Sequence, residues 1–366
     1  MKFRSERDSL VEALGTASRA VATRLTMPVL SGLLVEVAGN QLTVTGTDGD
    51  LSIRVGLEVI GVEDGTAVLP ARLATDITRS LEPGAVTIQA ADEQVEIGAA
   101  RSQFTLRSYP VVEFPNVSIS TNATAHVPAS ALAEGLRQVV RASSNDDARP
   151  LLTGVLLTTA SGLARLVATD SYRLALRDLD GTDQIAGEED LLVPARALTE
   201  LQRLISTDDQ TTVAVTTSPS EITFEIGQVS ISTRLISGNY PDYRQLIPES
   251  YPNSLHLGKE TLLAALRRVR LLVKDNTTPV RLSMRGGGVD LKVVSQEVGE
   301  GAETVDGDFT GEDLVIAFNP AYLIEGIEAV AGDEVIIETS DATRPATIRS
   351  GEADSYRYLL MPVRVT

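Results

Sequence analysis

Residues 69–72, Leu69-Pro70-Ala71-Arg72, return 124 residues later as Val193-Pro194-Ala195-Arg196. Upstream of both segments, Thr47-Asp48 recurs as Thr169-Asp170 at an offset of 122. The same offset relates Leu10, Leu14, Pro28, Leu30 and Gly32 to Leu132, Leu136, Pro150, Leu152 and Gly154. Offsets that stay constant over so long a stretch indicate an internal repeat, in which each copy forms one structural unit.

A third, weaker copy begins near Leu257. Leu262 and Leu266 take the first helix positions, and residues 318–323 resemble residues 193–198 at an offset of 125. The sequence therefore predicts three domains of about 120 residues each. We expect them at 1–122, 123–250 and 251–366, with joints near 120–125 and 248–254, segments rich in Ser, Thr, Asn or Pro.

Each copy has the same order of secondary-structure signals. Apolar residues at helical spacing come first, from Leu10 to Val21 in the first copy and from Leu262 to Val273 in the third. Strand-like alternation follows, as in residues 51–57. A second short helix is predicted at the Pro-Ala-Arg motif, with the proline in its first turn. The sequence thus predicts an α+β fold in which each domain has two halves, each with one helix and about four strands.

Composition excludes several kinds of site. The chain has 366 residues, no cysteine, and only two histidines, His126 and His256. Disulfides, thiolate nucleophiles and Cys-ligated metals are therefore excluded, and a histidine triad or zinc site would need isolated residues. No GxxxxGK[ST] loop and no strand-linked GxGxxG loop occurs. Residues 306–311 resemble a calcium loop, but Ala317 stands where a bidentate Glu is needed, so we expect an ordinary loop. We predict no catalytic residue, no metal and no cofactor.

The ends and the charge of the chain bear on its location and partners. Residues 1–8 alternate in charge and lack the apolar run of a signal peptide. No apolar run approaches the roughly 18 residues of a membrane span, so we expect a cytoplasmic protein with no membrane contact. The formal net charge of −18 argues at first sight against nucleic acid, since phosphate binding usually shows as a basic excess. The distribution of the charges matters more than their total.

Five separated segments closely resemble bacterial DNA polymerase III beta subunits, the beta sliding clamps. They are residues 1–3 (MKF), 26–31 (TMPVLS), 168–175 (ATDSYRLA), 240–244 (YPDYR) and 360–364 (LMPVR). Their order, the threefold repeat and the matching length extend the resemblance over the whole chain. It implies domains with two helices and two four-stranded antiparallel sheets, and two chains that close head to tail as a dimeric ring around double-stranded DNA. It also implies a processivity factor that catalyses nothing itself.

The resemblance implies that the first helix of each copy lines the hole, and such a helix should be basic because duplex DNA carries dense negative charge. From Lys259 to Lys274 there are five cations and one anion, although the chain as a whole is acidic. The second helix of the third copy instead carries Glu325 and Glu328 and no cation. The residues that we expect to face DNA are Arg19, Arg24, Arg72, Arg79, Arg137, Arg141, Arg149, Arg196, Arg203, Arg267, Arg268 and Arg270.

The resemblance also implies a hydrophobic pocket, between the second and third domains, for short linear motifs of the replicative polymerase, the clamp loader and repair proteins. The matching positions are Leu152, Thr169, Ser171, Tyr172, Arg173, Leu174, Pro241, Gln245, Leu246, Thr343, Pro345, Leu359, Leu360, Met361, Pro362 and Val363. Aliphatic side chains with one Met make an adaptable cleft, in which a few anchors dominate affinity. Gln245 replaces an Arg of some relatives and Ser171-Tyr172 a Gly-His pair, which puts the motif preference in doubt. Residues 359–363 also suit an edge strand that packs into the core.

Homodimer contacts of the family correspond to Phe104, Leu106, Leu271 and Leu272. The pair Leu271-Leu272 ends the basic helix, where an apolar pair has no obvious reason to face solvent; packing into the core is the alternative. Two other functions stay open on the residues alone. Plentiful carboxylates allow a two-acid glycosidase, although a single active site gives no reason for three similar domains. The remaining alternative is a scaffold of repeated α+β domains that does not bind DNA.

Overall fold

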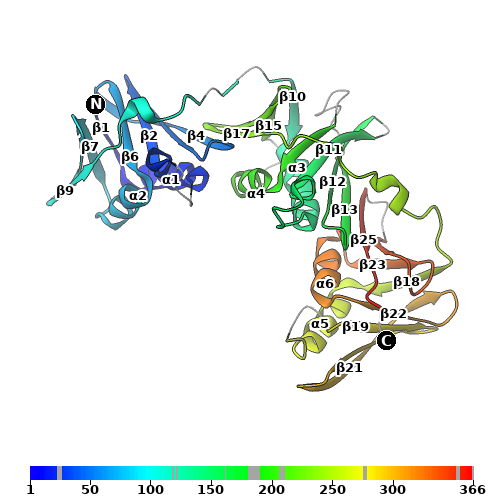
Figure 1. Cartoon of the computed structure of the whole chain (residues 1–366). Helices are drawn as coiled ribbons and strands as arrows, with labels where there is room; N and C mark the ends of the chain where they lie inside the picture. The colour runs from blue at the N-terminus through cyan, green and yellow to red at the C-terminus, as the bar shows by residue number, and fades with distance from the viewer. Residues whose placement is uncertain are drawn as a thin grey trace. The chain divides into compact units, whose positions relative to one another are not determined.

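The computed structural model describes residues 1–22, 27–117, 119–120, 123–160, 162–179, 190–205, 211–274, 278–351 and 355–364. They divide into two compact units (Figure 1). Unit 1 comprises Met1–Ala129 and Arg203–Leu235, and unit 2 comprises Ser130–Gln202 and Ile236–Thr366. The α-helices of the described residues are Arg7–Ala17 (α1), Ala71–Ser80 (α2), Ala129–Val139 (α3), Ala195–Leu204 (α4), Lys259–Arg270 (α5) and Pro320–Ala329 (α6).

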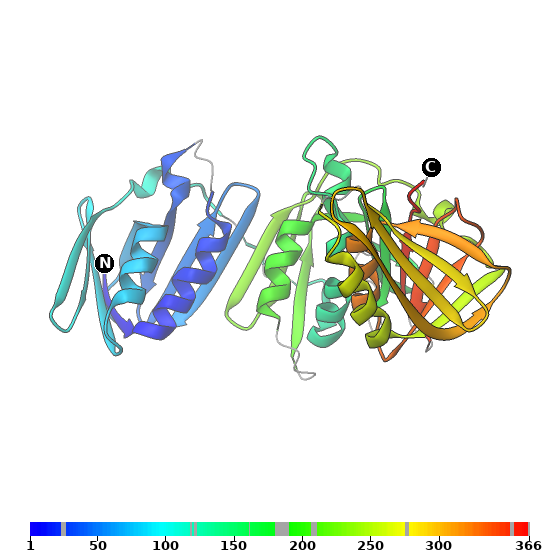
Figure 2. The same ribbon diagram turned by 90° about the horizontal axis from the view of Figure 1, so that it is seen from below.

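Unit 1 contains two antiparallel sheets, ordered β5-β1-β7-β8-β9 and β10-β15-β16-β17-β4-β3-β2-β6. The strands of the first are Ile60–Glu63 (β5), Lys2–Glu6 (β1), Ala85–Ala91 (β7), Gln94–Ala99 (β8) and Ser102–Arg107 (β9). Those of the second are Ala125–Pro128 (β10), Thr212–Thr217 (β15), Glu221–Ile226 (β16), Val229–Arg234 (β17), Leu51–Glu58 (β4), Gln41–Thr47 (β3), Gly32–Ala38 (β2) and Gly65–Pro70 (β6). Helices α1 and α2 lie side by side, and each contacts strands of both sheets (Figure 2).

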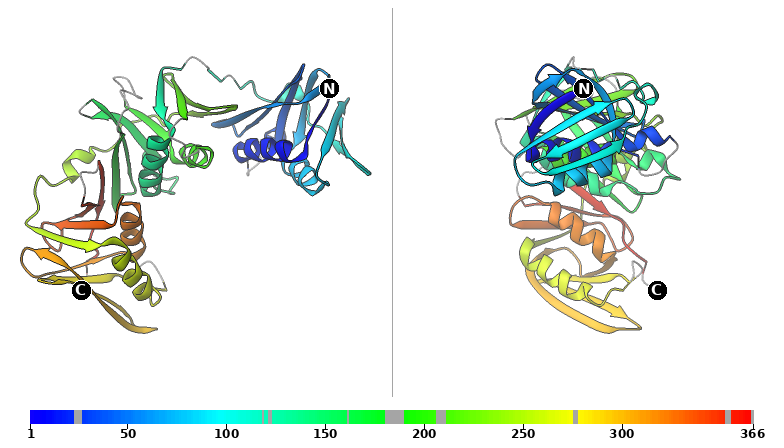
Figure 3. Two further views of the ribbon diagram at one scale, coloured as in Figure 1. Left: turned by 180° about the vertical axis from the view of Figure 1, so that it is seen from behind. Right: turned by 90° about the vertical axis from the view of Figure 1, so that its left-hand side faces the viewer.

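Unit 2 contains one long sheet, ordered β14-β11-β12-β13-β25-β24-β23-β18-β21-β20-β19-β22. Its strands are Leu191–Pro194 (β14), Gly154–Ala160 (β11), Leu163–Thr169 (β12), Arg173–Leu179 (β13), Tyr356–Leu360 (β25), Ala346–Ser350 (β24), Glu334–Thr339 (β23), Asn253–Gly258 (β18), Gly299–Thr310 (β21), Gly288–Ser295 (β20), Val280–Arg285 (β19) and Leu314–Phe318 (β22). Strand β21 pairs with β20 over residues 299–306 and with β18 over residues 307–310. Helices α5 and α6 pack against each other (Figure 3, left).

The predicted repeat recurs in the helices. Helix α3 begins 122 residues after α1, α4 begins 124 after α2, and α6 begins 125 after α4. Each copy thus supplies two helices and two runs of four antiparallel strands, with β5 added at one edge, and the predicted three-domain α+β clamp fold is confirmed. Alternate residues Leu51, Ile53 and Val55 of β4 are buried, as the period of two predicts.

The sheets continue from one copy into the next. Strand β17 of the second copy pairs with β4 of the first, with Ile231 opposite Ile53. Strand β13 of the second copy pairs with β25 of the third, with Leu174 opposite Leu359. The compact units therefore do not coincide with the repeats, and the domain boundaries at 122 and 250 stay a prediction.

Three local expectations are wrong. Helices α1 and α5 end at Ala17 and Arg270, so Val21 and Val273 lie beyond them. Pro70 and Pro194 each end a strand one residue before a helix, because proline has no N–H for the next ladder bond; Pro320 does open its helix. Residues 306–310 are not a loop: they belong to β21, and residues 307–310 pair with β18.

Candidate functional site

The turn from β12 to β13, residues 169–173, is held by its own polar side chains. The Oδ1 atom of Asp170 accepts hydrogen bonds from the backbone N–H groups of Tyr172 (2.9 Å) and Arg173 (3.0 Å). The backbone N–H of Ser171 donates to Oγ1 of Thr169 (3.2 Å). Ser171 has φ of 80°, a left-handed conformation that costs a residue with a side chain about 1 kcal/mol. The turn is therefore fixed, and it presents Tyr172 with 59% of its surface exposed.

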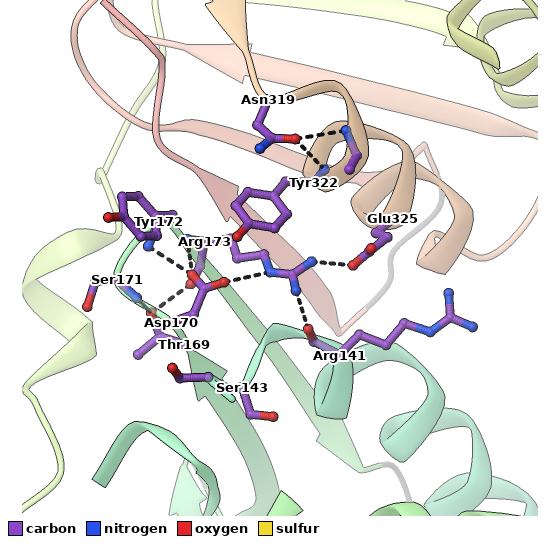
Figure 4. Close-up of polar contacts among 12 residues, drawn as sticks. Arg141, Ser143, Thr169, Asp170, Ser171, Tyr172, Arg173, Asn319, Tyr322 and Glu325 are labelled. Atoms are coloured by element: carbon purple, nitrogen blue, oxygen red, sulfur yellow. Dashed lines mark hydrogen bonds and ion pairs between the residues drawn. The ribbon is translucent and has the colours of Figure 1, made fainter. Parts of the chain in front are cut away.

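The guanidinium of Arg173 links this turn to two helices (Figure 4). Its Nε donates to Oδ2 of Asp170 (3.0 Å), one Nη donates to Glu325 of α6, and the other donates to the backbone oxygen of Arg141, which lies in the 3₁₀ helix Val140–Ala142 (η4). The same group lies over the ring of Tyr322, 4.2 Å from its centre. The side chain is only 9% exposed.

These partners decide what Arg173 can do. Burial alone would lower the pKa of Arg173, but the oxygens of Tyr358 and Glu325 raise it above its ordinary value. The guanidinium stays charged with its donors in use, so it positions the turn and α6 and is not free to bind a ligand. Tyr358 completes the cluster: its hydroxyl donates to the backbone oxygen of Tyr322 (2.9 Å).

The sequence did not identify Asp170, Tyr322 or Glu325 as members of this cluster. Asp170 carries a local signal, since an Asp one residue after a strand often binds the next backbone N–H groups. Tyr322 and Glu325 lie about 150 residues away in sequence, on α6, which begins where Asn319 accepts bonds from the N–H groups of Ala321 (2.9 Å) and Tyr322 (3.4 Å). Only the fold brings α6 to β13.

The sixteen predicted pocket residues fall into two groups. Those buried in the protein core are Leu152, Thr169, Leu174, Leu359 and Leu360. Those that reach the surface are Ser171, Tyr172, Pro241, Gln245, Leu246, Thr343, Met361 and Val363, with Arg173, Pro345 and Pro362 half-buried. The edge-strand interpretation of residues 359–363 therefore fits Leu359 and Leu360, which belong to β25, whereas Met361 is 43% exposed.

The exposed group is brought together by the β13–β25 pairing. Arg173 lies opposite Leu360, and just beyond this pair the N–H of Met361 donates to the backbone oxygen of Tyr172 (2.9 Å). The aromatic ring of Tyr172 and the thioether of Met361 therefore belong to residues whose backbones are hydrogen bonded to each other. Leu174 and Leu359, each two residues along the chain from Tyr172 and Met361, belong to a buried hydrophobic cluster with Tyr243. This cluster supports the two exposed side chains.

Arg149 lies beside the same turn. Its Nη1 donates to Oγ of Ser171 (3.3 Å) and its Nε to Oδ2 of Asp146 (2.9 Å). This position differs from those of the predicted DNA-facing arginines on helices. Arg24 lies outside the described residues. The others in the predicted DNA-facing set are exposed, except Arg137, which is half-buried.

Glutamates of α6 hold several of the predicted arginines in unit 2. Glu328 contacts Arg267 of α5 (Nη2 to Oε1, 2.8 Å) and Arg141 (Nη1 to Oε2, 3.6 Å). Arg137 of α3 donates to the carbonyl of Ala329 at the end of α6 (2.9 Å) and to Glu134, whose pKa this hydrogen bond lowers. The anions of α6 thus anchor cations of neighbouring helices.

The three arginines of α5 do not share one face. Arg267 faces α6, whereas Arg268 donates to both carboxylate oxygens of Glu303 on β21 (2.7 and 2.8 Å), a contact that lowers the pKa of Glu303. Arg270 is exposed and has no ion pair among the described residues. On α2, Arg72 and Arg79 lie 3.8 and 3.4 Å from Asp76 and stay largely exposed.

Two of the strand edges that lack a neighbour on one side within the described residues bear on the predicted dimer contacts. One is β9, the last strand of its sheet; the other is the 299–306 part of β21. Phe104 on β9 is 39% exposed, whereas Leu106 is buried in unit 1. Beside the second edge, Leu271 is 83% exposed, and Leu272 lies so close to Gly301 of β21 that an added Cβ would come within 2.7 Å of it.

Each copy contributes a pair of helices and antiparallel sheets, and these sheets continue from one copy into the next. Together with the basic helices and the free strand edges, this arrangement defines a DNA-clamp fold. The sequence profiles of the DNA polymerase III beta subunit match nearly all of the chain: the N-terminal domain over residues 1–118, the central domain over 126–242 and the C-terminal domain over 244–364. The chain belongs to the beta sliding clamp family. It is a DNA sliding clamp, the processivity factor of DNA polymerase III and a non-catalytic subunit.

Relatives and solved structures agree over full length. The chain is 34% identical to the beta sliding clamp of Streptomyces coelicolor and 30% identical to that of Vibrio cholerae, with 100% of each chain covered. The crystal structure of the Bacillus subtilis sliding clamp is 29% identical, with a TM-score of 0.94 and full coverage of both chains. A Bartonella birtlesii clamp solved with griselimycin bound has the same identity, coverage and TM-score.

No helix among the described residues is long and apolar enough to cross a membrane. No group of three or more His, Asp or Glu side chains in the described ranges is arranged to hold a metal ion.

Proposed function

We propose that two copies of this chain close head to tail into a ring around duplex DNA, with β9 of one copy pairing with β21 of the other. The proposal is carried by one observation: both strands have a free edge, and exposed Phe104 and Leu271 flank those edges. Pairing would cover the unpaired backbone groups and the apolar side chains together. Arg268 and Glu303, already paired beside the β21 edge, would keep that edge straight.

The expected lining of the ring suits sliding. Exposed arginines on α1 to α5 and their flanking turns would attract phosphates, which carry no sequence information. Asp76 and Glu328 each contact two of these arginines, which limits the net attraction. A lining of this kind holds DNA weakly, and enclosure keeps the protein in place.

The first prediction tests enclosure. Loaded onto nicked circular DNA by a clamp loader and ATP, the protein should stay bound through gel filtration in about 0.5 M salt, because screening removes phosphate attraction but not topology. Cutting the circle with a restriction enzyme should release it. The control is the same circle cut before loading. Equal retention on both forms would favour the alternative, a scaffold that does not encircle DNA.

We further propose that the exposed residues around Tyr172 and Met361 receive linear motifs of the replicative polymerase, the clamp loader and repair proteins. The support is chemical: the exposed side chains of Tyr172 and Met361 lie at the ends of β13 and β25, beside a buried cluster and on a turn that is already fixed. A preformed apolar site loses little entropy on binding a peptide.

The second prediction distinguishes residues of the peptide-binding pocket from residues of the hydrophobic core. Met361→Ala should weaken a bound peptide by about tenfold or more, as for an anchor residue, with unchanged melting temperature. Leu174→Ala should instead lower the free energy of unfolding by about 2–4 kcal/mol, since Leu174 is only 2% exposed. Fluorescence anisotropy and urea titration measure the two effects. Val294→Ala, at an exposed valine on β20, is the control; equal loss of affinity there would contradict the assignment.

A further inference from the structure

A cavity of about 580 Å³ lies beside the C-terminal tail in unit 2. The lining residues that matter here are Arg281 of β19, Val315 and Ala317 of β22, Thr343, and Val363 and Arg364 of the tail. Thr343 and Val363 also belong to the predicted partner pocket. The cavity, which we call the β22 groove, therefore continues that pocket along the outer strand of the sheet.

The backbone of β22 is open on the side of the groove. β22 is the last strand of its sheet, and the N–H of Val363 donates to the carbonyl of Ala317 (2.7 Å) on its outer edge. In an antiparallel strand, alternate residues direct their N–H and C=O groups to the same edge. Those of Val315 therefore face outward too, and no loop or tail segment of the described chain hydrogen bonds to them.

The groove is apolar in its floor and rigid in its wall. The Val315 side chain is 57% exposed, while Ile316 behind it is buried in the core. The wall around Thr343 is fixed by Asp341, whose Oδ1 accepts from the N–H groups of Thr343 (2.7 Å) and Arg344 (3.0 Å). A site built this way needs little rearrangement to accept an extended chain.

The charge of the groove is opposite to that of the protein. Arg281 and Arg364 are exposed at its rim, and neither has a carboxylate partner among the described residues. In a chain with a net charge of −18, two uncompensated arginines at one groove favour an acidic ligand.

We propose that the β22 groove holds the part of a partner protein that follows or precedes its pocket-binding motif. The occupant is an extended peptide that adds as a strand to β22 beside Val315, where the edge is not taken by the tail, with an apolar residue over Val315 and an acidic residue beside Arg281 and Arg364. This proposal rests on the proposed peptide-binding pocket, and the β22 groove would extend that pocket. It predicts that partners differ in affinity through residues outside their motif.

The test uses a labelled peptide selected for binding to the unchanged protein, and its affinity for Met361→Ala is measured alongside. It is compared with versions extended by Leu-Asp-Asp or Leu-Lys-Lys at either end. Leu-Asp-Asp at one end should tighten binding about fivefold, and Leu-Lys-Lys should not. The double variant Arg281→Glu/Arg364→Glu should remove the gain, as should Val315→Pro, which deletes the outward N–H. The control is Arg285→Glu, a single charge reversal elsewhere on β19 at an arginine that pairs with Asp290, which should keep the gain.

The outcomes are distinct. Equal affinity of bare and extended peptides, with the bare peptide still sensitive to Met361→Ala, would overturn the groove and leave the pocket intact. A bare peptide that binds Met361→Ala as tightly as the unchanged protein would overturn both. If the double variant altered the oligomeric state in sedimentation, the groove would be a contact between copies, and the proposal would fail.

Discussion

Replacing both Leu271 and Leu272 by alanine should convert the protein from a dimer to monomers at micromolar concentration. Leu271 is 83% exposed in the single chain, so only a partner can bury it, and Leu272 lies against Gly301 of β21, the strand that is expected to pair. Truncating two central apolar anchors costs about 2 kcal/mol each, which weakens each of the two interfaces of the ring about a thousandfold. Sedimentation velocity measures the change directly.

The same variant should lose its retention on circular DNA, because an open chain has no topological hold. Its fold should be retained, since Leu271 makes no core contact in one copy and Leu272 is only half-buried. The matched control is Leu73→Ala on α2, a leucine that is 50% exposed but remote in sequence from either edge. A doubly substituted protein that remained dimeric would place the interface elsewhere and would reject the proposed pairing of β9 with β21.

Replacing Arg173 by methionine should lower the free energy of unfolding more than any other single substitution at a charged residue near the surface. The substitution keeps the aliphatic stem but leaves Asp170 and Glu325 without their cation, and Asp170 is nearly buried. Removing one partner of a buried ion pair costs about 3–5 kcal/mol. Urea unfolding should show that loss. Peptide affinity should fall as well, because the turn that carries Tyr172 would lose its anchor.

Two further variants make this result specific. Arg349→Met breaks a two-bond contact with Glu338 that is more exposed, and it should cost about 1 kcal/mol or less. Adding Asp170→Asn to Arg173→Met should restore part of the stability, since no uncompensated anion then remains on the turn. If Arg173→Met were no worse than Arg349→Met, the cluster would be an ordinary surface network.

The sequence predicted what depends on local spacing. The offset from Leu10 to Leu132 located α1 and α3, and the alternation in residues 51–57 located β4. It did not predict which residues share a strand edge. Residues 306–310 have a polar, glycine-containing pattern, yet they form a strand because β18 lies opposite with its own backbone groups to satisfy.

The site was predicted less fully than the fold, for a related reason. Resemblance identified Arg173 and Met361, but the family pattern does not state whether a side chain is available or already bonded. Glu325 and Glu328 lowered the expected charge of α6, whereas in the folded chain they hold Arg173, Arg141 and Arg267. These contacts join side chains that lie about 60 to 190 residues apart in the sequence, and hydrophobic periodicity does not predict contacts over such separations.

The pairing of β17 with β4 and of β13 with β25 restricts how this protein can be divided. A fragment cut at a linker would keep only one strand of a pair that joins two repeats. The unpaired edge of that strand would be exposed, which favours aggregation over independent folding. Chimeras that exchange one repeat with that of another clamp should therefore match the facing strand as well. Transplanting β4 together with β17, or β13 together with β25, keeps each strand pair between residues that evolved as neighbours.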